Sequence, residues 1–360
     1  MPHALAEPNR ILIVRPSALG DVCRSVPVLA ALRARWPDAR IDWLVQDAYA
    51  PAIAAHPALS EAVIFPRRAL SPATRPDRLL AAVRWARSLR NRRYDLVLDC
   101  QGLLRSGLMA LATGAPVRVG DAAARELAWL AYTRRVPTQA DQHTVDRMLA
   151  LAQAAIEHYG PCGPIAGADM RLYTSPEDKA RAQAVLAPAG EAPLVVLAPT
   201  SRWPAKQWPD ERFAQLGQRL LEHRRLALAI VGGPGEADQC PKTRALAQAH
   251  DRVVDLVGRT DVGTLMGVVE RADLVVANDS AVLHMAVGFG RPLVALFGPT
   301  LTELVGPYRR QQDVIQRARP DRPGLHKLAS AAGMMQAIEV ADVLERALAR
   351  LSRDAAQTPA

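Results

Sequence analysis

The sequence contains few aromatic residues and few cysteines. Aromatic side chains make up only 4% of the 360 residues, so any core must be built mainly from aliphatic side chains. The four cysteines, Cys23, Cys100, Cys162 and Cys240, are widely scattered and have neither the spacing of a metal site nor that of a disulfide scaffold. This pattern favours a protein of a reducing compartment, and we expect no bound metal.

Long apolar segments are also missing. No apolar run approaches the roughly 20 residues that a membrane-spanning helix requires. The N-terminal residues MPHALAEPNR lack the basic-then-apolar pattern of a secretory signal peptide. We therefore expect a cytoplasmic protein.

Lysine is rare, but arginine is abundant and the net charge is +9. The positive charge is densest at residues 67–93, which contain nine arginines and a single acid, Asp77. Such a stretch can be a solvated helix face with its loop. It can also attract an anionic partner, such as a nucleic acid, a phosphorylated ligand or a membrane face. Nucleic acid is the weakest of these, because few aromatic residues lie nearby and no nucleic-acid-binding motif is present.

Strand-like and helix-like segments alternate through both halves of the chain. The first half predicts strands at 11–14, 41–45, 62–65, 96–99 and 117–119, with helices near 22–36, 48–56, 75–90, 106–113 and 143–157. The second half predicts strands at 194–198, 226–231, 253–255, 274–277 and 293–296, with helices at 210–223, after Gly235, at 262–270 and at 281–288. This order is typical of an α/β protein with two doubly wound parallel sheets.

The residues 160–169, GPCGPIAGAD, are rich in glycine and proline and indicate a linker. We therefore predict an N-terminal domain at 1–160, a linker at 161–170, a C-terminal domain at 171–320 and a helical tail at 321–360. Ligands of such folds bind at the carboxyl ends of the strands, so two facing sheets would form one cleft.

The loop PSALGD follows the first predicted strand and ends at Asp21, where a helix should begin. A carboxylate at this point can cap the helix by accepting backbone N–H bonds. It can also be a base held at the carboxyl edge of the sheet. The segment by itself leaves both interpretations open.

Three loops of the second half carry groups suited to a phosphate or a sugar. In TSRWPAKQW, Thr200 and Ser201 offer hydroxyls and Lys206 offers a positive charge. In GGPGE, Glu236 could accept hydrogen bonds from ribose hydroxyls. Each of these loops could equally be a structural turn.

The third loop, NDSAVLH, precedes a predicted helix. Asp279 and Ser280 can cap that helix, and its N-terminus can also bind an anion. His284 is either a packing residue or a ligand contact. A complete GxGxxG after the first strand and a GxSxG motif are both missing, which argues against a dinucleotide-dependent dehydrogenase and against a serine hydrolase.

The segments PSALGD, DCQGLLRSG, TSRWPAKQWP, NDSAVLH and LFGPT, in this order, resemble the heptosyltransferases of glycosyltransferase family 9, which build the inner core of lipopolysaccharide. The resemblance extends from about residue 10 to residue 308. Within the family it is strongest to the branch that places the first heptose on Kdo-lipid A, through IDWLVQDAYA, AARELAWLAY and QHTVDR.

The resemblance implies a GT-B architecture, in which two Rossmann-like domains face each other across a cleft. The N-terminal domain would bind the acceptor and the C-terminal domain the nucleotide sugar. It implies an inverting, metal-independent transfer from a nucleoside diphosphate sugar such as ADP-heptose, with no cofactor. The acceptor would be a lipid-linked anionic saccharide such as Kdo-lipid A. We expect a monomer in peripheral contact with the cytoplasmic face of the inner membrane, with no nucleic-acid partner.

The resemblance also implies roles for individual residues. Asp21 matches the catalytic base, and Lys206 matches the lysine that stabilises the leaving diphosphate. The donor contacts would be Thr200, Ser201, Glu236, Asp279, Ser280 and His284. The acceptor contacts would be Ser17, Arg67, Arg68 and Arg125.

Two positions depart from the family pattern. Arg24 replaces a histidine that the family commonly has, and Ala281 replaces a glycine. Two alternatives therefore stay open: a family 9 transferase that acts on a different surface glycan, and an inactive GT-B protein that binds a nucleotide sugar.

Overall fold

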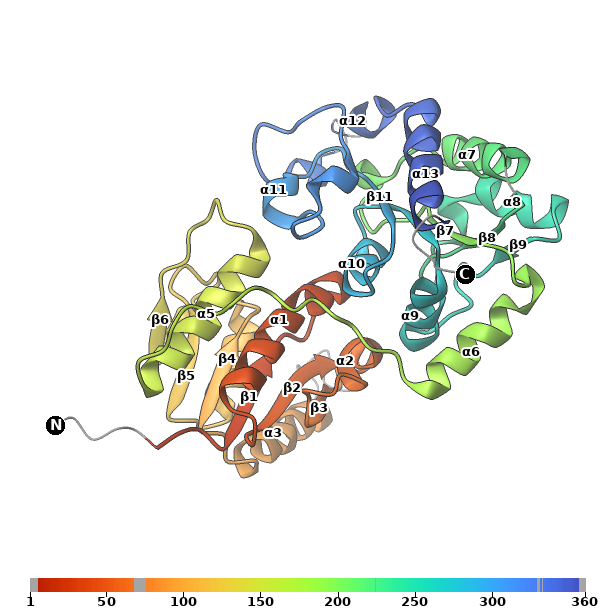
Figure 1. The fold of residues 1–360 in the computed structure, drawn as a ribbon. Helices are drawn as coiled ribbons and strands as arrows, with labels where there is room; N and C mark the ends of the chain where they lie inside the picture. Colours follow the sequence, from red (N-terminus) through yellow and green to blue (C-terminus); the bar gives the residue numbers. More distant parts are fainter. Residues whose placement is uncertain (1–5, 68–75, 224, 329–330, 332, 356–360) are drawn as a thin grey trace. The chain divides into compact units, whose positions relative to one another are not determined.

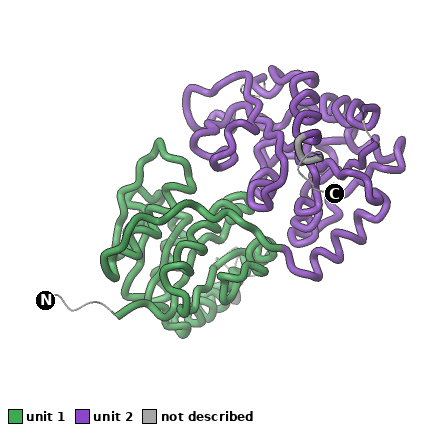
Figure 2. Tube along the Cα trace, viewed as in Figure 1, with its two compact units in different colours: residues 1–173 green, residues 174–360 purple. Residues whose placement is uncertain are grey.

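The computed structural model describes residues 6–67, 76–223, 225–328, 331 and 333–355. The chain divides into two compact units, residues 1–173 and residues 174–360 (Figure 2). Each unit contains one six-stranded sheet, and all the strand pairs are parallel. The prediction of an α/β protein with two doubly wound sheets is confirmed.

The N-terminal sheet has the order β3-β2-β1-β4-β5-β6 (Figure 1). Its strands are β1 Arg10–Val14, β2 Arg40–Gln46, β3 Glu61–Phe65, β4 Leu96–Asp99, β5 Val117–Asp121 and β6 Arg134–Val136. The central strand β1 is apolar and buried from Ile11 to Val14, as expected for a strand covered on both faces. The direction of winding reverses between β1 and β4, and such a reversal is where ligands bind in open α/β sheets.

Helices cover both faces of this sheet. The helix α1, Leu19–Arg35, packs against α5, Thr144–Tyr159, and also contacts the short α2, Pro51–Ala54. The helix α3, Pro76–Asn91, packs against α4, Leu104–Ala112. The short 3₁₀ helices are η1, Asp47–Tyr49, and η2, Ala128–Ala131.

The C-terminal sheet has the order β12-β11-β10-β7-β8-β9, so its reversal lies between β7 and β10. Its strands are β7 Leu194–Ala198, β8 Ala227–Ile230, β9 Val253–Asp255, β10 Leu274–Asn278, β11 Leu293–Leu296 and β12 Val314–Ile315. The strands β7, β8, β10 and β11 are buried throughout their lengths.

The C-terminal core is almost entirely aliphatic, with Trp208 and Phe213 as a buried edge-to-face pair. The helices of this unit are α6 Pro176–Leu186, α7 Asp210–His223, α8 Pro241–Ala249, α9 Val262–Arg271, α10 Ala281–Gly288, α11 Thr302–Val305, α12 Gly333–Gln336 and α13 Val340–Ala355. The 3₁₀ helices are η3 Ala187–Ala189, η4 Pro204–Lys206, η5 Ala237–Gln239, η6 Gln311–Asp313 and η7 Leu325–Lys327.

Every predicted strand is present, but several elements differ from the prediction. The helix α6 and the strands β6 and β12 were not predicted. The helix expected near 48–56 consists of η1 followed by the four-residue α2. The helix α1 begins at Leu19, so Asp21 lies inside its first turn and not ahead of it. In the described part of the chain, no helix has both the length and the apolar character needed to cross a membrane.

Candidate active site

Asp21 lies at the carboxyl end of β1, where the N-terminal sheet reverses its winding. It is the third residue of α1, and its carboxylate accepts a hydrogen bond from the Ala18 N–H at 3.3 Å. The same carboxylate forms ion pairs with Arg15, at 3.2 Å, and with Arg24. Its side chain keeps 26% of its surface exposed. Asp21 is therefore a helix cap and also an accessible carboxylate held between two guanidinium groups.

The two arginines dominate the ionisation of Asp21. Burial acts to raise the pKa of Asp21, but the charges of Arg15 and Arg24 hold it well below its ordinary value. The carboxylate is therefore ionised at neutral pH. It is also a weak proton acceptor as long as both guanidinium groups stay paired with it.

Arg15 is a site residue that the sequence reasoning missed. It is buried directly after β1, and its guanidinium donates a hydrogen bond to the Cys100 carbonyl oxygen after β4. It therefore joins the two strand ends between which the winding reverses. Its position after the apolar run ILIV was the only signal in the sequence.

The loop after β4 is fixed by Asp99. The buried Asp99 carboxylate accepts hydrogen bonds from the Gln101 and Gly102 N–H groups at 2.9 and 3.1 Å, and from the Tyr132 hydroxyl at 2.7 Å. Burial raises the pKa of Asp99. A Cβ atom at Gly120 would lie 2.3 Å from the Tyr132 ring, so only glycine leaves room for this tyrosine.

This loop also places two of the predicted acceptor contacts. The Ser17 N–H donates to the Gln101 side-chain oxygen at 3.3 Å, and the Arg125 N–H donates to the Gly102 carbonyl oxygen at 3.0 Å. Ser17 and Arg125 thus lie on loops bonded to the same short segment. The Arg125 guanidinium is exposed.

The other two predicted acceptor arginines come just after β3 in the sequence, and β3 is an edge strand of the sheet. Arg67 follows β3 and is exposed, and β3 is separated from β1 by β2. Arg68 lies outside the described residues. Within the described residues, neither Arg67 nor Arg125 forms an ion pair.

The C-terminal unit has a second charged site at its own reversal point. The Lys206 Nζ atom lies 2.6 Å from the Asp279 Oδ2 atom, and both side chains are mostly buried. Lys206 ends η4 in the loop after β7, and Asp279 follows β10, the neighbouring strand. The structure therefore brings together two residues that the sequence placed on separate loops.

Thr200 and Glu236 are also brought together. The Thr200 hydroxyl donates to the Glu236 carboxylate at 2.6 Å, and the Gly233 N–H donates to the same oxygen at 2.7 Å. A Cβ atom at Gly232 would lie 3.0 Å from the Thr200 methyl carbon, so the glycine permits the two loops to approach closely. Glu236 thus connects the loops after β7 and β8.

Ser201 is held by two glutamines that the sequence reasoning did not single out. Its N–H donates to the Gln239 side-chain oxygen at 3.2 Å, and its carbonyl oxygen accepts from the Gln207 amide at 2.7 Å. Its hydroxyl donates to the Asp279 carbonyl oxygen at 3.4 Å. These bonds place Ser201 beside the Lys206–Asp279 pair.

Asn278 is a further missed residue, fully buried at the end of β10. Its side-chain amide donates to the Pro199 carbonyl oxygen at 2.7 Å, and its side-chain oxygen accepts from the Trp208 N–H at 3.1 Å. It therefore fixes both ends of the loop that carries Thr200 and Lys206. Its position directly before Asp279 was the only sequence signal.

Ser280 and His284 lie on the helix after Asp279. Ser280 is the N-cap of α10, but its side chain makes no capping hydrogen bond. Its hydroxyl oxygen is buried and has no partner among the described residues. His284 is buried in the second turn of α10.

The C-terminal tail contributes a residue to this site. The His326 ring on η7 packs edge-on against Trp203, with 5.4 Å between ring centroids. Burial and the positive charge of Lys206 lower the pKa of His326, which favours the neutral ring at pH 7. This contact could not be expected from the sequence, because more than a hundred residues separate His326 from Lys206.

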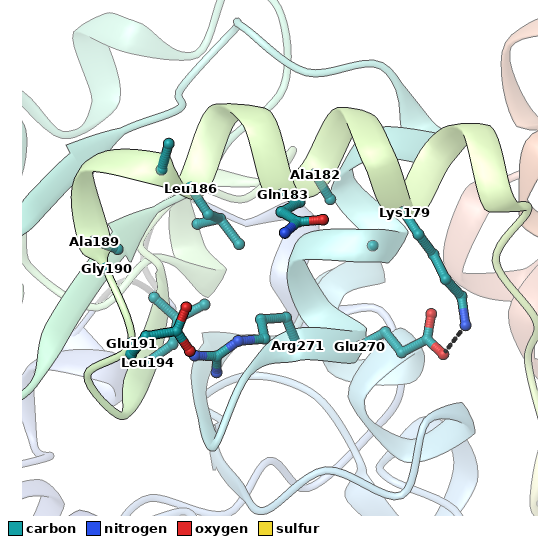
Figure 3. A pocket seen from close by; sticks show the side chains of 12 residues that line it. Lys179, Ala182, Gln183, Leu186, Ala189, Gly190, Glu191, Leu194, Glu270 and Arg271 are labelled. Carbon is teal, nitrogen blue, oxygen red and sulfur yellow. Dashed lines mark hydrogen bonds and ion pairs between the residues drawn. The ribbon is translucent and has the colours of Figure 1, made fainter.

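A separate pocket of about 580 Å³ lies between α6, η3 and α9 (Figure 3). Lys179 and Glu270 form an ion pair of 2.8 Å at its wall. Leu194 and Arg271 also line it, and they lie at the amino ends of β7 and β10. The pocket is therefore at the opposite ends of these strands from Thr200 and Asp279. In the part of the chain that the structure describes, no cluster of His, Cys, Asp and Glu could hold a metal ion.

Known proteins are similar to most of this chain. Lipopolysaccharide heptosyltransferase 1 of Pseudomonas aeruginosa is 28% identical over 323 residues, which cover 88% of this chain and 86% of that protein. Lipopolysaccharide heptosyltransferase 1 of Escherichia coli K12 is 27% identical over 326 residues, which cover 89% of this chain and 97% of that protein.

Solved structures show the same fold. The structure of E. coli ADP-heptose LPS heptosyltransferase II has a TM-score of 0.78 and 22% identity, and the match covers 96% of this chain and 99% of that one. The structure of E. coli heptosyltransferase WaaC with ADP has a TM-score of 0.74 and 24% identity, and the match covers 95% of this chain and 99% of that one. The predicted GT-B fold class is confirmed.

The family description "Glycosyltransferase family 9 (heptosyltransferase)" matches residues 82–335. This span includes Lys206, Asp279 and the rest of the C-terminal charged site. The chain therefore belongs to glycosyltransferase family 9 and is a glycosyltransferase.

Proposed function

We propose that this protein transfers a heptose from ADP-heptose to a Kdo-lipid A acceptor with inversion at the anomeric carbon. The observation that carries the proposal is the placement of Asp21 and Lys206. Each lies at the carboxyl edge of a sheet, at the point where that sheet reverses its winding. The relatives named lipopolysaccharide heptosyltransferase 1 support the choice of sugar and acceptor.

The C-terminal unit binds the donor in this proposal. Lys206 and the hydroxyls of Thr200 and Ser201 contact the diphosphate. Glu236 accepts hydrogen bonds from the ribose hydroxyls. Asp279, Ser280 and His284 surround the sugar end of the donor. The Lys206 ammonium lies 2.6 Å from the Asp279 carboxylate, so an incoming diphosphate competes with Asp279 for that ammonium. The solved complex of heptosyltransferase WaaC with ADP supports the choice of nucleotide.

The N-terminal unit binds the anionic acceptor through Ser17, Arg67, Arg68 and Arg125. Arg67 and Arg125 are exposed and have no acidic partner among the described residues, which suits phosphate and carboxylate groups, since guanidinium groups bind both in bidentate fashion. The N-terminal edge therefore has the charge that the proposed acceptor requires.

Asp21 acts as the general base. It takes the proton of the attacking hydroxyl while the acceptor oxygen bonds to the anomeric carbon and the bond to the diphosphate breaks. Lys206 and the hydroxyls beside it offset the charge that grows on the leaving diphosphate. No metal takes part in this scheme.

The same proposal places the protein in the cytoplasm, peripheral to the inner face of the inner membrane. It acts as a monomer, without a nucleic-acid partner. The lipid-linked nature of the acceptor is the reason for the membrane location.

A transfer assay tests the function. Incubation with ADP-heptose and Kdo-lipid A should release ADP and yield a heptosylated lipid, at an unchanged rate in EDTA. UDP-glucose and GDP-mannose are the controls and should support little transfer. A thermal shift with ADP but no transfer to any lipid acceptor would favour the inactive, nucleotide-sugar-binding alternative. Transfer only to another glycan would overturn the choice of acceptor.

A further inference from the structure

Exposed apolar side chains are distributed very unevenly between the two units. Among the described residues, nine of the ten exposed large apolar side chains lie in the N-terminal unit, and Leu328 is the tenth. Five of the nine lie on α4, on η2 or directly before η2, and α4 and η2 pack against each other. We call this set the leucine face: Leu104, Leu108, Leu111, Leu127 and Leu130.

The helix α4 contributes a stripe to the leucine face. Leu104, Leu108 and Leu111 are spaced by four and three residues, so they lie on one side of the helix. The opposite side, with Met109 and Ala110, is buried. The outward side of a surface helix is normally polar, and here it is apolar.

The segment at η2 packs closely against α4. A Cβ atom at Gly107 would lie 3.0 Å from the Ala128 carbonyl oxygen, so glycine permits the close approach. The Glu126 carboxylate accepts a hydrogen bond from the Leu104 N–H at 3.2 Å. These contacts make α4 and η2 one surface.

Two consecutive residues before η2 have a left-handed backbone conformation. Glu126 and Leu127 have φ angles of 56° and 61°, which residues other than glycine rarely adopt. Leu127 and Leu130 nevertheless remain 60% and 59% exposed. Strained backbone of this kind clusters at functional sites, which is consistent with a functional surface here.

Arginines border the leucine face. Arg105 is exposed on α4, and Arg135 stacks over Trp129 of η2 at 4.5 Å. The neighbouring helix α3 adds exposed Arg84, Arg87 and Arg90. No ion pair in the described part of the chain involves any of these five arginines. Apolar side chains bordered by unpaired arginines are the composition of a surface that binds anionic lipid.

We propose that the leucine face docks on an anionic lipid bilayer, an assignment that rests on the proposed function for the source of that bilayer. The leucines enter the boundary between head groups and acyl chains, and the arginines contact lipid phosphates.

The leucine face begins at the edge that carries the acceptor contacts. The Gly102 carbonyl oxygen, two residues before Leu104, accepts a hydrogen bond from the Arg125 N–H, and the Gln101 side chain, three residues before Leu104, accepts one from the Ser17 N–H. A saccharide anchored in the same bilayer would therefore meet the loop of Asp21 at the rim of the docked surface.

Sedimentation with lipid vesicles tests the proposal. The probe is a vesicle made of equal parts phosphatidylglycerol and phosphatidylcholine, compared with one of phosphatidylcholine alone. The protein should bind the anionic vesicle, and added salt should weaken that binding. The double variant Leu108→Asp/Leu130→Asp should bind at least about tenfold more weakly. Arg105→Gln/Arg135→Gln should also weaken binding and flatten its salt dependence.

Matched controls lie in the C-terminal unit. Leu328→Asp and Arg219→Gln replace exposed residues of the same types and should bind vesicles as the unmodified protein does. A second double variant, Leu104→Gln/Leu111→Gln, repeats the test with uncharged side chains. The thermal shift with ADP checks each variant separately, so a failure of the proposed donor site is distinguished from a failure of docking.

Three results would overturn the proposal. The first is equal vesicle binding by both leucine double variants and the unmodified protein. The second is equally tight binding to phosphatidylcholine alone, which would remove the role of charge. The third is a dimer in sedimentation velocity that Leu108→Asp/Leu130→Asp dissociates, which would assign the leucine face to a second copy of the chain.

Discussion

The two units share one fold but differ in the charge balance at their reversal points. At the N-terminal edge, two buried guanidinium groups surround the single carboxylate of Asp21. At the C-terminal edge, one ammonium group, that of Lys206, faces one carboxylate, that of Asp279. The first arrangement has an excess of positive charge and the second is balanced. The same topology therefore holds two sites of different charge: one with excess positive charge and one in which a cation and an anion are paired.

The edges also differ in how their loops are fixed. The C-terminal loops are joined by neutral and charged side chains that bond to backbone, chiefly Glu236, Gln239 and Asn278. The N-terminal loops depend on Arg15 and Asp99. On the proposed function, the C-terminal site would be organised before the donor arrives. Asp21 would become a stronger base only if an arginine moved away from it, and we propose that the anionic acceptor draws that arginine away.

The largest expected effect is at the N-terminal edge. Asp21→Asn should lower kcat about 10²–10⁴-fold, because the amide cannot take the proton of the attacking hydroxyl. The affinity for ADP-heptose should be unchanged, since the donor residues lie in the other unit. Steady-state kinetics and a donor titration measure the two quantities. Asp238→Asn, at an exposed position, is the control, and near-normal turnover of Asp21→Asn would remove the base assignment.

The next effect is at the C-terminal edge. Lys206→Met should lower kcat about 10²–10³-fold, as expected when a group that stabilises charge in the transition state is lost. Unlike Asp21→Asn, it should also weaken donor binding. Lys242→Met is the matched control, because Lys242 forms an exposed pair with Glu211 away from the site. Equal donor affinity in Lys206→Met and the unmodified protein would argue against contact with the diphosphate.

A smaller effect concerns stability and pH. Arg24→Gln removes one partner of Asp21 and should cost about 1–3 kcal/mol at pH 7, which lowers Tm by several degrees. The folded pKa of Asp21 is depressed, so this stabilisation is complete above the unfolded pKa near 3.9. It is lost as pH falls through the folded pKa. The Tm difference should therefore shrink below about pH 4, and a constant difference from neutral to acid pH would contradict the ion pair.

The smallest effect is at the pocket between α6 and α9. Lys179→Gln breaks an exposed ion pair with Glu270 and should change the free energy of unfolding by less than about 1 kcal/mol. Transfer activity should stay at the level of the unmodified protein. A large loss of activity would mean that this pocket, and not only the reversal point of the sheet, takes part in binding.

The sequence predicted the strands better than the helices around them. Strands such as β7 and β10 are continuous apolar runs, which a parallel sheet buried on both faces requires. The strand β6 was missed because it is only Arg-Arg-Val, and its pairing with β5 determines its structure. The helix α6 was missed because its apolar periodicity is weak, although it packs closely on α9 through Gly267.

The site was predictable where polar residues directly follow apolar strands. Thr200, Lys206 and Asp279 were singled out in this way, and the structure brings Lys206 and Asp279 together, a contact that the sequence did not predict. Arg15 and Asn278 were missed because each adjoins a buried strand and its role depends on partners far away in the sequence. His326 could not be found, since its contact with Trp203 depends on how the tail folds back.

The anomeric configuration of the product tests the central claim most directly. A single displacement, with Asp21 as the only base, forms a new bond on the face opposite the leaving diphosphate. NMR of the heptosylated lipid should therefore show an anomeric configuration opposite to that of the donor. A product with the donor's own configuration would contradict the account, because retention requires a second group to react at the anomeric carbon.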